Sequence, residues 1–237
     1  MQVYISNKEI AQIAKSLVHI SCGQPPPKCI DIDAVAGYLG LTVVYEQFAE
    51  DDQDKIGFAS DGRNMLTVIR DGQKRRIIFP KNTIVLDRFL LYPIENHRRR
   101  FTLAHEISHL LLNHADPVHT APCFNRIYDT ERTYSMDELR ERMNLGECQA
   151  NTMAAMILMP EEVLAASVRR YFRRKQIPVY GDCVFPPKVK PALQKMSEEL
   201  GVSYTAMLIQ LRKYGLLEDR EMSQYFSLIV KDGDGYE

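Results

Sequence analysis

Two histidines separated by three residues, His105 and His109, are the feature that most restricts what this chain can fold into. They lie in the segment FTLAHEISHLLLNH, and residues four apart share one face of an α-helix, with about 5–6 Å between their Cβ atoms. Two imidazole nitrogens at that spacing can bind one zinc ion. Glu106 follows His105, and in the pattern HExxH this glutamate takes a proton from the attacking water. The segment predicts a zinc-binding helix over residues 96–114.

The alternative interpretation is a buried helix that contains two hydrogen-bonded histidines by chance. A catalytic zinc needs a third protein ligand, so the rest of the chain decides between the two. A metzincin would have glycine and histidine where this chain has Leu112 and Ala115, which excludes that class. His114, five residues after His109, is expected to point away from the shared face. His119 lies in a predicted loop and stays open as a ligand.

Glu147 is the better candidate for the third ligand. It lies in the segment GECQANTMAAMILMP, which predicts a second helix, and Asn151 follows it one turn later. The small residues Ala150 and Ala154 would let this helix approach the first one closely. Asn151 could then accept a hydrogen bond from a ligand histidine and fix its tautomer. A solvent-exposed helix face is the competing interpretation of Glu147.

The chain before the histidine segment predicts two helices and several strands. Ser6 and Glu9 form a capping-box pattern ahead of an amphipathic helix, and DIDAVAGYLG predicts a second, shorter helix. The segments LTVVYEQF, KIGFAS, NMLTVIR and RRIIFP predict strands, and NTIVLDR a further one. Asp71-Gly72 between two of them is a hairpin-turn signal. We therefore expect an α+β fold in which a small antiparallel sheet precedes the zinc-binding helix.

The chain after the second ligand helix is expected to be mainly helical. PEEVLAASVRRYFRRK predicts a helix, and QIPVYGDCVFPP is interpreted as a linker-like break. Two short helices with a turn at Gly201 then resemble a helix-turn-helix. The start of its second helix, SYTAML, carries no basic residue, so we expect packing or partner docking there, and no direct binding of nucleic acid.

Composition excludes several other classes. The formal net charge of -1 gives no general attraction for nucleic acid or an anionic membrane. No apolar run is long enough to span a bilayer, and the first residues lack a secretory signal, so we expect a cytoplasmic protein. The five cysteines form no CxxC pair and are expected to be reduced thiols. The basic run HRRRF is interpreted as a solvated or salt-bridged face rather than a binding site for an acidic partner.

Two blocks of the sequence, RRRFTLAHEISHLLLNH and ECQANTMAAMILMP, together resemble the ImmA/IrrE family of metallo-endopeptidases, a gluzincin-like branch of the zincins. The resemblance extends more loosely from the N-terminal helix to about Leu217. It implies that His105, His109 and Glu147 are the zinc ligands and that Glu106 is the catalytic carboxylate. Two positions depart from the family pattern: Gln149 replaces a frequent acidic residue, and Met153 replaces an aromatic residue, which we interpret as a packing change.

The resemblance implies a zincin-like peptidase domain over residues 1–175 and a helical, helix-turn-helix-like region over 176–237. It implies a cytoplasmic zinc endopeptidase that cleaves one regulatory protein, such as a phage-type or mobile-element repressor. His119, Tyr128 and Tyr134 are the candidate donors to the transition state, because they lie between the two ligand helices. The alternative function is a zinc-containing interaction module or toxin–antitoxin partner that inactivates a repressor by binding.

Overall fold

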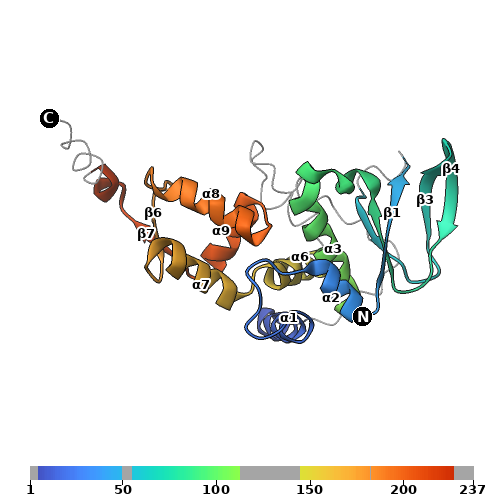
Figure 1. Ribbon diagram of the computed structural model, residues 1–237, viewed down its shortest axis with the longest axis horizontal. Helices are drawn as coiled ribbons and strands as arrows, with labels where there is room; N and C mark the ends of the chain where they lie inside the picture. The colour runs from blue at the N-terminus through green and yellow to red at the C-terminus, as the bar shows by residue number, and fades with distance from the viewer. Residues whose placement is uncertain (1–4, 50–54, 113–144, 182, 227–237) are drawn as a thin grey trace. The chain divides into compact units, whose positions relative to one another are not determined.

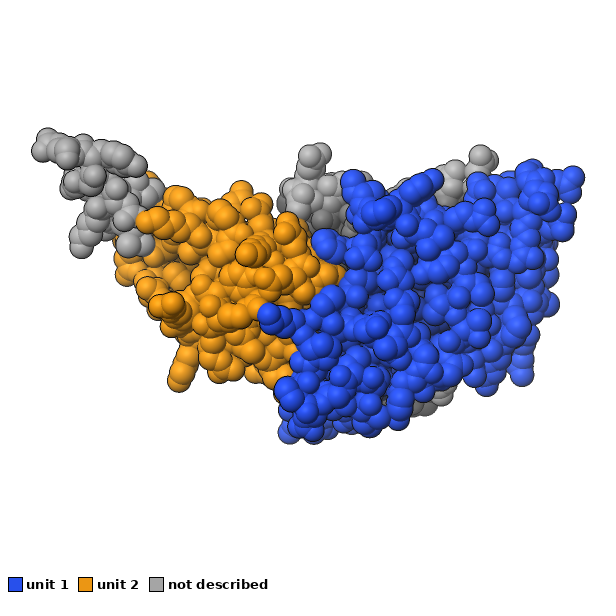
Figure 2. All heavy atoms as spheres, viewed as in Figure 1, with its two compact units in different colours: residues 1–158 blue, residues 159–237 orange. Residues whose placement is uncertain are grey.

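The computed structural model describes residues 5–49, 55–112, 145–181 and 183–226. The chain forms two compact units, residues 1–158 and 159–237, which are coloured separately in Figure 2. The division between them comes earlier in the chain than the predicted boundary at 175/176, because the helix that follows Pro160 packs within the second unit. The assignment of a separate function to each part stays a prediction.

Unit 1 contains four α-helices, two 3-10 helices and five strands in its described residues. The α-helices are α1 (Asn7–Cys22), α2 (Ile32–Tyr38), α3 (Asn96–Leu111) and α6 (Leu145–Leu158). The 3-10 helices are η2 (Arg88–Leu91) and η3 (Pro93–Glu95). The strands are β1 (Thr42–Phe48), β2 (Gly57–Ala59), β3 (Met65–Arg70), β4 (Gln73–Ile78) and β5 (Thr83–Asp87). The α+β class expected from the sequence is confirmed.

Local sequence signals explain where several of these elements begin and turn. The Ser6 hydroxyl accepts a hydrogen bond from the Glu9 N–H, and the Glu9 carboxylate accepts one from the Ser6 N–H at 2.8 Å, so the predicted capping box is present. Asp71 and Gly72 have φ angles of 54° and 73°, and they join β3 to β4 by the predicted tight turn.

The sheet is mixed, whereas the sequence predicted an antiparallel one. Its strand order is β2-β5-β1-β3-β4, and β1 and β5 run parallel, with Val44 opposite Val85. The buried run of β5, TIVLD, explains the difference. A strand that is buried on both faces favours an interior position, and β5 lies between β2 and β1.

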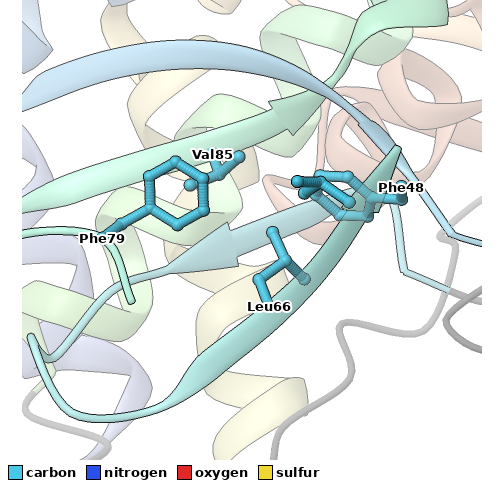
Figure 3. Close-up of a cluster of buried hydrophobic side chains, with 5 residues drawn as sticks. Phe48, Leu66, Phe79 and Val85 are labelled. Atoms are coloured by element: carbon cyan, nitrogen blue, oxygen red, sulfur yellow. The ribbon is translucent and has the colours of Figure 1, made fainter. Parts of the chain in front are cut away.

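Apolar side chains from β1, β3 and β5 and from the residue directly after β4 form a core cluster on one face of this sheet (Figure 3). Its buried members are Phe48, Leu66, Val68, Phe79 and Val85. Leu66 and Val68 alternate along β3 with the less buried residues on either side, which is the pattern of a strand with one face in the core.

Helix α3 lies at the centre of unit 1, where it packs against α6, β2 and β5 (Figure 1). Its basic first half is tied to earlier elements. The Arg99 guanidinium donates to both oxygens of Asp33 at 3.0 and 2.9 Å and to the Tyr45 hydroxyl at 3.0 Å. Arg100 is buried and donates to the Ile30 carbonyl at 2.7 Å. The salt-bridged interpretation of HRRRF therefore holds for Arg99, while Arg100 is part of the core.

Unit 2 contains α7 (Glu161–Phe172), β6 (Ile177–Tyr180), α8 (Val189–Leu200), α9 (Tyr204–Lys213) and β7 (Leu217–Arg220). The helix–turn–helix arrangement of α8 and α9 is present. Gly201 ends α8 with φ 66°, and the Ser203 hydroxyl accepts a hydrogen bond from the Ala206 N–H at 3.2 Å. The predicted linker instead forms β6, which pairs with β7 in parallel. Four buried residues drive this pairing, which local sequence signals do not reveal.

Among the described residues, no helix is both long enough and apolar enough to cross a membrane.

Candidate metal centre

His105, Glu106 and His109 lie in the buried middle of α3. Their exposed fractions are 4 %, 3 % and 8 %. The two histidine rings lie on one face of the helix with centroids 4.5 Å apart, and their Nε2 atoms are 2.9 Å apart. The helical spacing predicted from the sequence therefore brings both imidazoles to one point.

Glu147 reaches the same point from the first turn of α6. Its Oε2 atom is 3.3 Å from His105 Nε2, and its Oε1 atom is 3.4 Å from His109 Nε2. The Glu147 side chain is almost fully buried, so the solvent-exposed interpretation is wrong. Ala150 and Ala154, both completely buried on α6, leave room for the close packing of α6 against α3.

These three residues form the single group of histidine, cysteine and acidic ligand atoms able to hold a metal among the described residues. Their candidate ligand atoms all lie within 4.8 Å of one another. Two nitrogens and one carboxylate oxygen are a donor set that suits zinc. A tetrahedral zinc with bonds of about 2.0–2.1 Å needs ligand atoms roughly 3.3 Å apart. The two nitrogens are 2.9 Å apart, and each lies 3.3 or 3.4 Å from a different oxygen of the Glu147 carboxylate, so the three groups are close to the required spacing.

Strand β2 lies directly against Glu106. A Cβ atom built on Gly57 would be 2.6 Å from Glu106 Oε1 and 2.7 Å from Thr102 Cγ2. The φ angle of Gly57 is not in the left-handed region, so glycine is required there for space and not for backbone conformation. On the same strand, Ala59 gives the Glu106 carboxylate a backbone hydrogen bond. β2 thus fixes the carboxylate from the side of the sheet.

The two carboxylates of the cluster have opposite electrostatic environments. Removal from water raises the pKa of Glu106 to about 7, against the opposing effects of His109 and of the Ala59 hydrogen bond. Burial also acts to raise the pKa of Glu147. There, hydrogen bonds and charge interactions with His105 and His109 outweigh burial and lower the pKa to about 2. One carboxylate therefore stays ionised beside the imidazoles, while the other can exchange a proton near neutral pH.

Other predicted residues fall around this cluster or outside the described part of the chain. The Asn151 Oδ1 atom is buried and accepts no hydrogen bond from the described residues, so its supporting role stays a prediction. Gln149, which departs from the family pattern, is buried and donates to the Ile5 carbonyl at 2.7 Å, where it ties α6 to the start of α1. His114, His119, Tyr128 and Tyr134 lie outside the described residues.

Sequence reasoning missed the contribution of Gly57. An isolated glycine inside the strand pattern KIGFAS signals a close backbone approach, so the signal was present in the sequence. The sequence did not indicate which group approaches Gly57, because Gly57 and Glu106 are far apart in the chain.

The sequence model of the IrrE N-terminal-like domain, a peptidase family, matches residues 36–212. The chain belongs to this family. The match includes α3, α6 and β2, and hence every residue of the cluster described above. Membership in the IrrE N-terminal-like family confirms the resemblance found in the sequence and supports a metallopeptidase-type function. No curated protein matches the chain in a sequence search.

Proposed function

We propose that this chain is a zinc-dependent endopeptidase whose metal ligands are His105, His109 and Glu147. The observation that carries the proposal is the buried convergence of these three side chains, with Glu106 directly beside them. A structural zinc site would close its fourth position with a protein ligand, whereas the three ligands found among the described residues leave one position for substrate. Bound zinc would polarise the substrate carbonyl and lower the pKa of a water molecule towards ~7.

Glu106 then acts as the general base and acid. Its carboxylate, which burial holds at a pKa of about 7 in the metal-free chain, takes a proton from the attacking water and returns that proton to the leaving amine. Gly57 and Ala59 hold this carboxylate in place from β2. The remaining donor to the transition state is proposed among His119, Tyr128 and Tyr134, as the sequence suggested.

The substrate is proposed to bind as an extended strand along β2. This strand is at one edge of the sheet, and its Ile56 and Ser60 backbone groups bond to β5, so those of Gly57 and Ala59 face away from β5. The Ala59 N–H already donates to Glu106, so the groups proposed to pair with a peptide are those of Gly57 and the Ala59 carbonyl. Edge backbone groups of this kind can pair with an extended peptide. Gly57 is in close contact with Glu106, so a peptide paired with this edge would lie near the carboxylate that cleavage requires. A peptide complex with the substrate away from β2 would contradict this part of the proposal.

We propose a DNA-binding repressor as the substrate and the cytoplasm as the location, where such a repressor acts. In the test, a chelator removes metal from the chain, and one portion is then reloaded with zinc. Both portions are incubated with repressors encoded next to the gene of this chain. Cleavage should require zinc, and intact mass should give one cleaved bond. Repressor that is bound and inactivated without any cleavage would instead support the non-proteolytic interaction module.

A further inference from the structure

Strand β4 forms one edge of the sheet (Figure 1), and β2, which lies against Glu106, forms the opposite edge. Among the described residues no strand pairs with its outer side, and its residues are exposed except for the half-buried Ile77. Thr67 on β3 accepts a hydrogen bond from the Ala49 N–H, so its backbone groups face β1. Arg76, directly opposite Thr67, therefore turns its own N–H and C=O away from β3.

The same alternation applies to Lys74 and Ile78, two residues to either side of Arg76. The open edge thus offers backbone donors and acceptors at two basic residues and one apolar residue. Ile78 is paired with Met65 across the strands, and these two side chains are 53 % and 58 % exposed. The basic side chains of Lys74 and Arg76 and the apolar pair Ile78–Met65 therefore lie in a row on the same face of the β3–β4 hairpin.

Arg75 lies on the other face of the hairpin, opposite Val68 on the core side of β3. Its guanidinium is 3.5 Å from the Asp71 carboxylate, in the turn of the same hairpin. The basic face of the open edge is therefore formed by Lys74 and Arg76.

We propose that the β4 edge binds an extended acidic segment of a partner protein as an added strand, with acidic side chains beside Lys74 and Arg76 and an apolar side chain beside Ile78 and Met65. Main-chain hydrogen bonds to the open edge supply affinity in this mode, and the alternating side chains supply specificity. This surface is separate from the proposed active site and goes beyond the peptidase function.

A second copy of the chain is the less suitable occupant. Two β4 strands paired antiparallel about Arg76 would place Arg76 against its own copy, and like charges directly opposite each other are destabilising. Lysine and arginine on an edge often serve only to prevent such pairing. A strand with that sole purpose would not leave the apolar Ile78–Met65 pair exposed beside the charges. The positive charges of Lys74 and Arg76 therefore disfavour pairing with a second copy and favour pairing with an acidic strand.

The test measures binding of a fluorescent synthetic peptide in which glutamate alternates with threonine and which ends in valine. The full chain carries Glu106→Gln, so that the peptide stays intact whether or not the chain is a peptidase. The peptide should bind the chain, and N-methylation of its strand-pairing amides, which keeps every charge, should abolish binding. Arg76→Glu should weaken binding by roughly fivefold or more, since it replaces attraction across the strands by repulsion.

Lys81→Glu is the matched control, with the same charge change at an exposed position just after β4. Screening should limit its effect to about twofold. Equal binding of the N-methylated peptide would overturn the proposal, because charge alone would then explain the affinity. An absence of peptide binding to the full chain would also overturn the proposal. The same holds if the Arg76→Glu variant self-associates while the unmutated chain does not bind the peptide.

Discussion

At the scale of single residues, the candidate centre contains two glutamates whose surroundings shift their pKa values in opposite directions. Glu147 faces two imidazoles and has a lowered pKa of about 2, whereas Glu106 is buried beside β2 and has a raised pKa of about 7. Separated pKa values of this kind allow one carboxylate to hold a cation while the other transfers protons. The difference in pKa between the two glutamates therefore follows from burial and neighbouring charges, and not from residue type.

The raised pKa of Glu106 predicts how the stability of the metal-free chain depends on pH. Between the ordinary glutamate pKa of 4.5 and about 7, the folded chain binds more protons at this residue than the unfolded chain does. Stability is therefore lost as the pH rises through this range. Because glutamine cannot titrate, metal-free Glu106→Gln should gain stability relative to the unmutated chain from pH 5 to pH 8, by up to about 3 kcal/mol.

Chemical denaturation of both metal-free chains across this pH range measures that difference. Glu162→Gln, on the first turn of α7 in unit 2, is the control, since its side chain is exposed to solvent. A stability difference between Glu106→Gln and the unmutated chain that stays constant with pH would contradict the assigned environment of Glu106.

Gly57 gives a second residue-scale prediction. Gly57→Ala would place a methyl group 2.6 Å from Glu106 Oε1, so the carboxylate or β2 must move. Because a displacement of about 1 Å at a catalytic group can cost on the order of a hundredfold in rate, we expect kcat to fall by roughly tenfold to a hundredfold. Zinc content should not change, because the three atoms nearest to the added methyl group belong to Glu106 and Thr102 and not to the candidate ligands.

The matched control for this variant is Gly37→Ala on α2, where a Cβ atom would meet nothing within 4 Å. Its activity should equal that of the unmutated chain, and its stability should be equal or slightly higher, since alanine favours a helix. Full activity of Gly57→Ala would show that β2 does not fix Glu106.

At the scale of elements, α3 is held in place from both of its sides. Its C-terminal half packs on α6 and β2, and its basic N-terminal half is bonded to α2, to the segment before α2 and to β1. The position of the histidines therefore depends on contacts formed by arginines that lie about one and a half to three turns away from them.

Arg99→Ala should destabilise the chain by about 1–3 kcal/mol, because it removes a two-oxygen ion pair with Asp33 and a hydrogen bond to Tyr45 at a site that is only partly exposed. Thermal unfolding of the zinc-free chain measures this loss. Arg88→Ala, an exposed arginine in η2, is the control and should change stability by less than about 0.5 kcal/mol. A double-mutant cycle with Asp33→Ala isolates the pair, and zero coupling energy would contradict the proposed tie.

Elements that depend on neighbouring residues could be predicted from the sequence, and those that depend on distant residues could not. The capping box at Ser6, the Asp71-Gly72 turn and the His105–His109 spacing each involve residues within four positions of one another. The parallel β1–β5 and β6–β7 pairings join segments that are far apart in the chain. The pairing of distant strands is set by burial in the folded chain, which local patterns do not encode. Glu147 was found because the second helix carried its own recognisable pattern.

At the scale of the whole molecule, the three candidate metal ligands belong to unit 1 and come from two helices separated in sequence. A metal that binds only the folded arrangement stabilises it by mass action. Zinc at a hundredfold excess over Kd should therefore raise stability by about 2.7 kcal/mol, seen as a higher Tm.

Glu147→Ala should reduce this zinc-dependent rise in stability sharply. Gln149→Ala is the control: Gln149 lies two residues further along α6 and is bonded to Ile5, so its loss should lower stability by the same amount with and without zinc. An unchanged zinc shift in Glu147→Ala would move the third ligand elsewhere.

The most direct test of the account compares the unmutated chain with Glu106→Gln, with zinc content and repressor cleavage measured on the same samples. Glu106 is not among the three candidate ligands, so the substitution should leave zinc content unchanged. It removes the group that transfers the proton, so cleavage should fall by at least about a hundredfold. Equal zinc with cleavage only in the unmutated chain is the predicted result. Equal cleavage by both chains would contradict the assigned role of Glu106, and an absence of zinc from both would contradict the metal centre itself.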